Sequence, residues 1–134
     1  MGHEIEKIAL SRGHNIVCKI DIDNPQDFDS PEFKSADVAI EFTAPTQAYG
    51  NILKCFEHGV KVVSGSTGWM ADHCQEMQDL CKDGSHTLIA IDDYGTGHSN
   101  MVNVLRYAPQ LIKIDRELIS GIQNDSNKQL FVRN

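Results

Sequence analysis

Two groups of residues have the types and the spacing that chemistry at a strand end requires, and Ala90-Ile91 separates them. The first group is Glu41-Phe42-Thr43 together with Gly65-Ser66-Thr67-Gly68, and each segment follows a short apolar run. Small residues at a strand end let backbone amides approach a ligand, and ligands gather at that edge of an open parallel sheet. The alternative is that Gly65, like Asp21 at the end of the apolar run 16–20, is simply a turn residue at a strand end. The candidate binding residues are Phe42, Thr43, Gly65, Ser66, Thr67 and Gly68.

Asp92-Asp93 begins the second group, which also contains Lys113. Adjacent aspartates offer the hard oxygen ligands that Mg²⁺ or Mn²⁺ prefers. Two such ions close together can activate water and stabilise a leaving oxygen. Two carboxylates alone make only a weak site. The other interpretation is therefore that Asp92, Asp93 and Lys113 form local hydrogen bonds or an ion pair.

Strand-like and helix-period segments alternate along the chain, and this alternation predicts the fold. The segments expected to form strands are 16–21, 38–42, 60–63, 88–91 and 111–114. Strands that alternate with helices indicate a parallel α/β sheet. We expect residues 1–134 to form a single α/β domain with a mostly parallel five-stranded sheet. Helices should cover both faces, as in a Rossmann- or flavodoxin-like three-layer sandwich.

The composition is that of an ordinary globular protein of 134 residues, which suits one domain. The formal charge is 12 − 19 = −7, which disfavours binding to nucleic acid or to anionic membranes. We see no long apolar span and no leader in which an apolar stretch follows basic residues. We therefore expect a soluble, cytoplasmic protein of the kind obtained by recombinant expression. Its cysteines form no C-x-x-C pair and should be reduced thiols; they are Cys18, Cys55, Cys74 and Cys81.

Residues 1 to about 89 resemble the nucleotide-binding domain of dihydrodipicolinate reductase, which uses NADH or NADPH. Met1-Gly2 is similar to the end of that family's glycine-rich turn. The resemblance implies that Asp21 accepts hydrogen bonds from the adenosine ribose. It also implies that the segments 41–45 and 65–68 lie near the nicotinamide.

The sequence departs from the reductase pattern at several points. The first strand and the first two glycines of the fingerprint, which permit close approach to the pyrophosphate, are missing. The family's catalytic histidine pair and lysine are absent as well. Ile91-Asp92-Asp93 replaces the expected asparagine-phenylalanine-serine segment. The resemblance therefore implies at most weak binding of NAD(P) and no reductase activity.

Residues from about 88 to 134 resemble the EAL domain, a barrel that hydrolyses cyclic di-GMP with two divalent metals. The match is carried by Ile91-Asp92-Asp93-Tyr94-Gly95-Thr96-Gly97 and by Leu111-Ile112-Lys113-Ile114-Asp115, at the family's spacing. The resemblance implies that Asp92 and Asp93 are metal ligands and that Lys113 lies near the metal-bound water or phosphate. The signature glutamate and its partner residues have no counterpart here. At most weak binding of Mg²⁺ or Mn²⁺ is therefore expected.

The junction falls inside a βα repeat and keeps the alternation intact. Residues 87–90 are typical of a strand in both the reductase family and the EAL family. Our leading hypothesis is an engineered chimera that tests the recombination of related fragments and has no catalytic activity. The alternatives are a vestigial NAD(P)-binding module and a remnant of a metal-dependent cyclic di-GMP phosphodiesterase.

The absent first strand would leave a gap beside the strand expected at 38–42. Unpaired backbone groups there would be costly if they were buried. The two flanking strands could close up, or the strand at 111–114 could fill the gap or lie at the sheet edge. In the third outcome two copies form a homodimer or exchange strands.

Overall fold

The computed structural model describes residues 1–92 and 111–115. In chain order the elements are α1 (Gly2–Ser11), the 3₁₀ helix η1 (Pro25–Asp29), α2 (Pro31–Lys34), β1 (Val38–Glu41), α3 (Pro45–Glu57), β2 (Lys61–Ser64), α4 (Met70–Cys81), β3 (Leu88–Asp92) and β4 (Leu111–Asp115). Among these elements there is no helix with the length and apolar character needed to cross a membrane.

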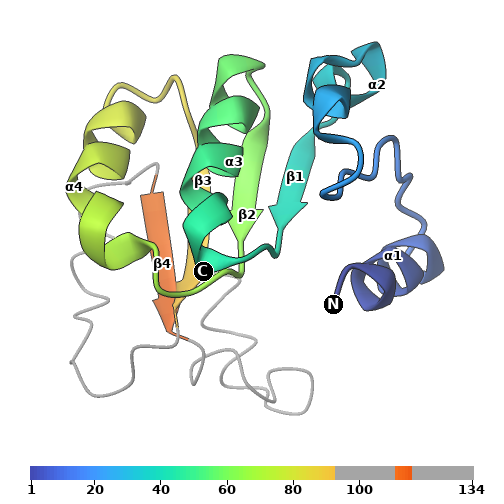
Figure 1. Ribbon diagram of the computed structural model, residues 1–134, viewed down its shortest axis with the longest axis horizontal. Coiled ribbons are helices and arrows are strands. Elements are labelled where there is room, and N and C mark those ends of the chain that lie inside the picture. Colours follow the sequence, from blue (N-terminus) through green and yellow to red (C-terminus); the bar gives the residue numbers. More distant parts are fainter. Residues whose placement is uncertain (93–110, 116–134) are drawn as a thin grey trace.

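The described strands form one parallel sheet in the order β1-β2-β3-β4 (Figure 1). Because all strands run in the same direction, their carboxyl ends lie along one edge. Strand β4 pairs with β3 over their full lengths, from Leu88 opposite Leu111 to Asp92 opposite Asp115. The strand expected at 111–114 therefore lies at the edge of the described sheet, which was one of its expected positions.

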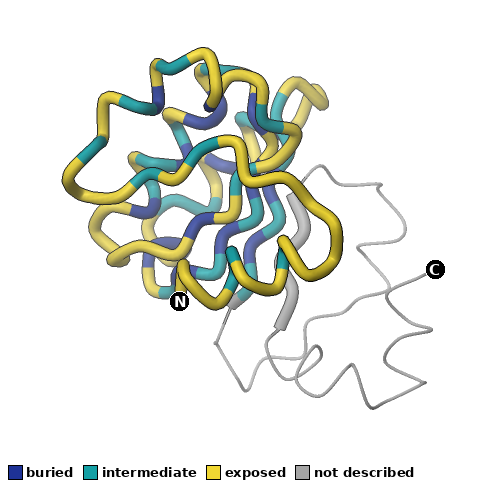
Figure 2. The backbone as a smooth tube through the Cα atoms, turned by 90° about the vertical axis from the view of Figure 1, so that its right-hand side faces the viewer, coloured by how far each residue is buried: buried dark blue, intermediate teal, exposed yellow. Residues whose placement is uncertain are grey.

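Helices α3 and α4 lie on the same face of the sheet (Figure 1). They connect β1 to β2 and β2 to β3, and two right-handed crossovers in one direction place both helices on one side. The core lies between these helices and the strands, where Figure 2 shows buried segments. Its fully buried members include Ile52, Met77, Val62, Leu88 and Cys81.

The expected strand at 16–21 does not form, so four of the five expected strands are present. Cys18 and Ile20 pack against the core, but no strand pairs with this segment within residues 1–92 and 111–115. The side-chain amide of Asn24 donates to the carbonyl of Lys19 at 2.9 Å instead. An apolar run becomes a strand only when a neighbouring strand takes its hydrogen bonds.

The expectation of helices on both faces is also not met in the described part of the chain. Val38 and Ile40 on β1 point away from α3 and are 46% and 51% exposed. Helix α1 lies beyond the outer side of β1 and not across the sheet (Figure 1). A second helical layer would require the strand order to reverse direction, and the described strand order does not.

Candidate functional site at the carboxyl edge

Glu41, the last residue of β1, holds together a hydrogen-bond network at the carboxyl edge. Its side chain is buried, with the residue only 6% exposed. Oε1 accepts hydrogen bonds from the backbone N–H of Thr43 at 2.7 Å and from the hydroxyls of Thr43 and Ser66. Oε2 accepts from the hydroxyl of Ser64 at 2.5 Å. Bonds to an ionised acceptor are stronger than neutral ones, so Glu41 ties the loops after β1 and β2 together.

Ser66 makes a second connection between these loops. Its Oγ lies 2.8 Å from Oε1 of Glu41 and 2.9 Å from the carbonyl oxygen of Thr43. The N–H of Thr43 also lies 2.8 Å from this hydroxyl oxygen. Thr43 and Ser66, which are 23 residues apart in the chain, are therefore held in direct contact.

Gly65 is required by the close approach of Phe42. A Cβ atom added at Gly65 would lie 2.1 Å from Cε1 and Cζ of the Phe42 ring. The N–H of Gly65 donates to the carbonyl of Glu41 at 2.9 Å, which extends the β1–β2 pairing into the loop. The aromatic ring thus lies directly against backbone at the carboxyl edge.

The loop after β2 ends in a left-handed glycine and a buried indole. Gly68 has φ +85°, a conformation that favours glycine. The indole N–H of the buried Trp69 donates to the carbonyl of Ser66 at 2.9 Å. Thr67, which lies between Ser66 and Gly68 in the chain, is half-buried. Trp69 therefore fixes the path of the loop just before α4 begins.

Helices α3 and α4 both begin at this edge, directly after the two loops. Their N-cap residues, Ala44 and Trp69, make no side-chain capping hydrogen bond. The first N–H groups of a helix and its dipole favour negative charge. The carboxyl edge therefore offers positive helix ends beside the cluster of Glu41, Thr43 and Ser66.

The one thiol whose charge is coupled to this cluster is unreactive. Burial, and then the negative charge of Glu41, raise the pKa of Cys55 on α3 to about 12. A thiol with this pKa stays protonated at neutral pH and is a poor nucleophile. Cys55, which lies in the last turn of α3, therefore supplies no nucleophile.

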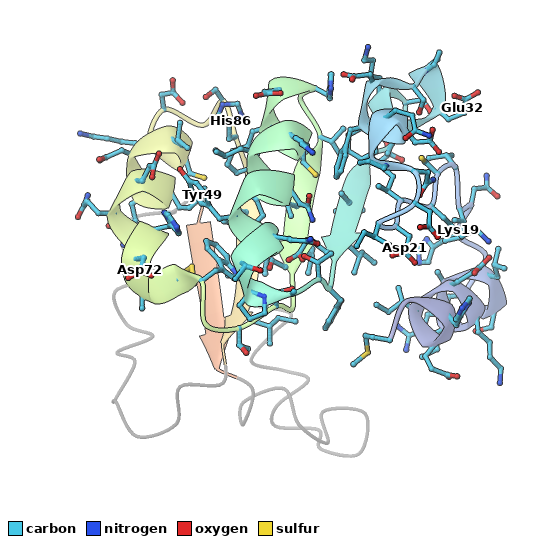
Figure 3. All side chains as sticks on the ribbon, viewed as in Figure 1. Lys19, Asp21, Glu32, Tyr49, Asp72 and His86 are labelled. Carbon is cyan, nitrogen blue, oxygen red and sulfur yellow. The ribbon has the colours of Figure 1, made fainter. Side chains whose placement is uncertain are left out.

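The structure does not join the other predicted cofactor residues to this cluster by hydrogen bonds. Asp21 is exposed, and its Oδ1 accepts from the N–H of Ile22 at 2.8 Å. Figure 3 places Asp21 near Lys19, on the outer side of β1. Gly2 is the exposed first residue of α1, and a Cβ there would meet nothing within 4 Å.

The predicted metal site is described only in part. Asp92 ends β3 opposite Asp115, and Lys113 pairs with Ala90 in the register of the sheet. Asp93 lies outside the described residues. Within the described ranges, no three His, Cys, Asp or Glu side chains gather in a way that could hold a metal ion.

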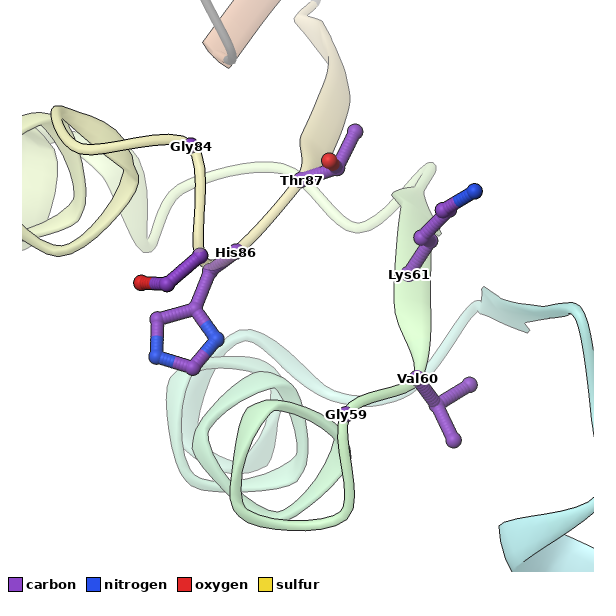
Figure 4. Close-up of a pocket in the computed structure, with 7 residues that line it drawn as sticks. Gly59, Val60, Lys61, Gly84, His86 and Thr87 are labelled. Carbon is purple, nitrogen blue, oxygen red and sulfur yellow. The ribbon is translucent and has the colours of Figure 1, made fainter.

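A hollow at the opposite, amino end of β2 and β3 is separate from this site (Figure 4). It is lined by the segments 59–61 and 84–87. The His86 ring stacks on Phe56 with centroids 4.5 Å apart, so it acts as a packing residue. The hollow lies away from the hydroxyls and helix N-termini at the carboxyl edge.

The sequence predicts the two loops, but not that Glu41 and Ser64 connect them. The signal was present, because Glu41 shares the covered face of β1 with Ala39 by strand alternation. A carboxylate on a covered face needs hydrogen-bond donors. The neighbouring strand end supplies them as Ser64 and Ser66.

The parallel strand order, the helix-covered face and the glycine-containing loops at the carboxyl edge define a parallel α/β module that is consistent with a Rossmann-like fold. The chain belongs to the dihydrodipicolinate reductase N-terminus family, whose model matches residues 1–92. The EAL domain model matches residues 55–134, so the two matches overlap over residues 55–92. Both resemblances expected from the sequence are confirmed, and the chain combines segments of two families.

The relatives match segments of the chain that differ in length. The 4-hydroxy-tetrahydrodipicolinate reductase of Christiangramia forsetii is 39% identical over 97 residues, covering 72% of this chain and 39% of that protein. The 4-hydroxy-tetrahydrodipicolinate reductase of Dictyoglomus turgidum is 30% identical over 123 residues, which cover 90% of this chain and 40% of that protein. The cyclic di-GMP phosphodiesterase TpdA of Vibrio parahaemolyticus is 42% identical over 40 residues, which cover 30% of this chain and 7% of that protein. The chain thus spans about two fifths of the length of these reductases. No solved structure matches it.

Proposed function

We propose that the chain is a module that binds a nicotinamide dinucleotide and has no catalytic activity of its own. The observation that carries the proposal is the Glu41 network, which holds the loops after β1 and β2 together at the carboxyl edge. A pre-formed pair of loops lowers the entropy cost of binding a ligand there. The membership of residues 1–92 in the reductase family supports the dinucleotide as the ligand.

The chemistry of the edge fits this ligand. The uncapped starts of α3 and α4 favour the negative charge of phosphates. Phe42 and Gly65 offer an apolar surface and an accessible backbone for an aromatic ring. Asp21 supplies an exposed carboxylate that can accept hydrogen bonds from a ribose diol.

The lack of catalysis is proposed because the one carboxylate of the cluster, Glu41, is buried and both of its oxygens already accept hydrogen bonds from neighbouring groups. Hydroxyls and one backbone N–H are the donors to Glu41, and no described histidine or lysine hydrogen-bonds to this carboxylate. The relatives that carry the reductase name are more than twice as long as their matched parts. The module would therefore bind a dinucleotide without reducing a substrate.

A matched pair of variants tests this proposal. Trp69 is the only tryptophan, and it contacts Ser66, so energy transfer from its indole to bound NADH reports binding at this edge. Glu41→Gln should weaken NADH binding about tenfold, because the loops lose their charged acceptor. Glu32→Gln makes the same chemical change at an exposed site on α2 and should bind as the wild type does. Equal affinity in all three proteins would contradict the proposal.

We also propose that the chain is a recombined protein whose two family segments share one sheet, with deliberate engineering as its origin. The in-register pairing of β3, which contains the junction, with β4 supports the shared sheet. The engineered origin is proposed because the junction keeps the alternation of strands and helices intact. Amide hydrogen exchange should then show the same protection in 111–115 as in 88–92. Independent exchange of residues 111–115 would contradict the shared sheet, and a natural gene encoding the joined chain would contradict an engineered origin.

A further inference from the structure

The half-buried side chain of Asn24 connects three parts of the segment between α1 and α2. Its Oδ1 accepts a hydrogen bond from the backbone N–H of Asp21 at 2.7 Å. Its Nδ2 donates to the carbonyl of Lys19 at 2.9 Å and to Oδ2 of Asp27 at 2.6 Å. An amide nitrogen carries two hydrogens, so both of its donors are in use. Asn24 therefore joins residues that precede it in the chain to one that follows it.

These three partners fix the direction in which the amide group of Asn24 faces. The backbone N–H of Asp21 is a donor, whereas the oxygens of Lys19 and Asp27 are acceptors. Turning the amide over would place its oxygen against two acceptors and its nitrogen against a donor. Such a change would break all three hydrogen bonds, so the side chain has one favourable orientation in this segment.

Both backbone polar groups of Asp21 are bonded to Asn24. In addition to the bond from its N–H, the carbonyl of Asp21 accepts from the backbone N–H of Asn24 at 3.2 Å, which closes the turn 21–24. The peptide groups on either side of the Asp21 Cα are thereby held in place. Because these groups set the direction of the Cα–Cβ bond, Asn24 determines where the carboxylate of Asp21 points.

Asn24 also attaches this turn to the core. Asp27, which accepts the third side-chain bond, lies on η1, and its N–H donates to the carbonyl of Asn24 at 3.0 Å. The next residue, Phe28, is buried, and its ring packs edge-on against Phe33 with centroids 5.1 Å apart. The turn 21–24 is therefore anchored to a buried segment through Asn24 and Asp27.

The carboxylate of Asp21 keeps the capacity to bind a ligand. Asp21 is exposed, and among the described residues the N–H of Ile22 is the one donor to its side chain. A carboxylate can accept about four hydrogen bonds, so Oδ2 and part of the capacity of Oδ1 stay open to a ligand. A ribose diol presents two O–H donors, and a carboxylate held in one direction accepts both at a lower entropy cost.

We propose that Asn24 is a positioning residue, which orients the carboxylate of Asp21 toward the adenosine ribose of the dinucleotide. The inference rests on the proposed function, in which Asp21 binds that ribose. Asn24 acts through Asp21 and does not contact the ligand with its side chain, because its amide is already bonded to Asp21, Lys19 and Asp27. Without this amide the carboxylate samples several directions, and binding must restrict it to one.

Titration with NADH, followed by energy transfer from Trp69, tests the proposal on single variants. Asn24→Ala should weaken NADH binding about tenfold, because the turn that carries Asp21 loses three hydrogen bonds. Asn15→Ala makes the same change at an exposed asparagine of the same segment and should bind NADH as the wild type does. Asn24→Asp keeps the size of the side chain but cannot donate to Asp27, so it should also weaken binding about tenfold. This variant gives the answer if Asn24→Ala does not fold.

A double-mutant cycle separates positioning of Asp21 from a general loss of structure. Asp21→Ala should weaken NADH binding about tenfold, whereas Asp23→Ala, which removes the same charge from a neighbouring exposed position, should leave it unchanged. In the Asp21→Ala background, substitution of Asn24 should weaken binding less than about twofold, because no ribose-binding carboxylate is left to orient.

The possible outcomes distinguish this inference from the proposed function. Wild-type affinity for NADH in the Asn24 variants would overturn the inference alone. An equal loss of affinity with and without Asp21 would also overturn it, because Asn24 would then act on the fold in general. If the wild type itself shows no saturable NADH binding, the proposed function is contradicted and the inference is overturned with it.

Discussion

The aromatic ring of Phe42 lies against the backbone of Gly65, so closely that a Cβ at Gly65 would stand 2.1 Å from two of its carbons. The two residues follow neighbouring parallel strands, and the bond from Gly65 N–H to the Glu41 carbonyl holds them together. This contact joins the loops after β1 and β2, at which the nicotinamide dinucleotide is proposed to bind. A single substitution at Gly65 therefore tests whether the contact is present.

Gly65→Ala should displace the Phe42 ring while the fold stays intact. The ring is 38% exposed and can rotate away, so the free energy of unfolding should fall by only about 0.5–1 kcal/mol. Ring chemical shifts and NADH affinity should both change. Gly50→Ala is the control, because a Cβ there meets nothing within 4 Å and α3 should gain about 0.5–1 kcal/mol. A Phe42 ring that keeps its position in Gly65→Ala would contradict the contact.

Glu41→Gln should lower the free energy of unfolding by about 1–3 kcal/mol, because bonds to a charged acceptor are replaced by bonds to a neutral one. Glu41→Ala should cost more, about 3 kcal/mol or above, since buried donors of Ser64 and Ser66 lose their acceptor. Urea unfolding measures both. Glu32→Gln on α2 should stay within about 0.5 kcal/mol of the wild type. A Glu41→Gln protein as stable as the wild type would exclude the proposed role of the carboxylate.

The pKa of Cys55 predicts a loss of stability at alkaline pH. Burial and the charge of Glu41 raise this pKa from 9.0 to about 12 in the folded protein. The contribution is therefore complete below about pH 9, where both states are protonated, and it falls as pH rises from 9 towards 12. The slope should approach about 1.4 kcal/mol per pH unit within that window.

The comparison of the wild type with Cys55→Ala isolates this alkaline effect. Burial also raises the pKa of Cys81, so the wild type loses stability through both thiols. The alanine variant should be less stable at neutral pH because it leaves a cavity, but it should lose less stability as the pH rises. If the free energy of unfolding fell equally steeply with pH in both proteins, the raised pKa of Cys55 would be contradicted.

Trp69→Phe should loosen the loop between β2 and α4. The phenylalanine fills most of the buried volume but cannot donate to the carbonyl of Ser66, so a cost of about 1–3 kcal/mol is expected. The amide of Gly68 in this loop should exchange faster with solvent. Unchanged exchange in the variant would show that the indole hydrogen bond does not hold the loop.

The apolar pattern was sufficient to locate β1, β2, β3 and β4 near their observed positions, because strands in a parallel sheet carry a strong apolar signal. It was wrong for residues 16–21, since the pattern reports which side chains are apolar and not whether a neighbouring strand is present. The direction of the crossovers, which places α3 and α4 on one face, also depends on the strand order. Neither property can be read from a local window of sequence.

The loops of the candidate site could be predicted from their small residues and their place after strands, but the connection between them could not. Glu41 accepts from Ser64 and Ser66, which lie 23 and 25 residues further along the chain. Those partners become neighbours only when β1 pairs with β2 in the observed register. A charged residue at the end of an apolar strand was the available signal.

The most direct test of the central claim is calorimetric titration of the chain with NADH and with NADPH. We expect saturable binding of at least one of them, with a Kd below about 1 mM, and no oxidation of the bound cofactor when a reductase substrate is added. Absence of saturable binding for both cofactors at about 1 mM would contradict the proposed binding function. Turnover of the substrate would contradict the proposed lack of catalysis.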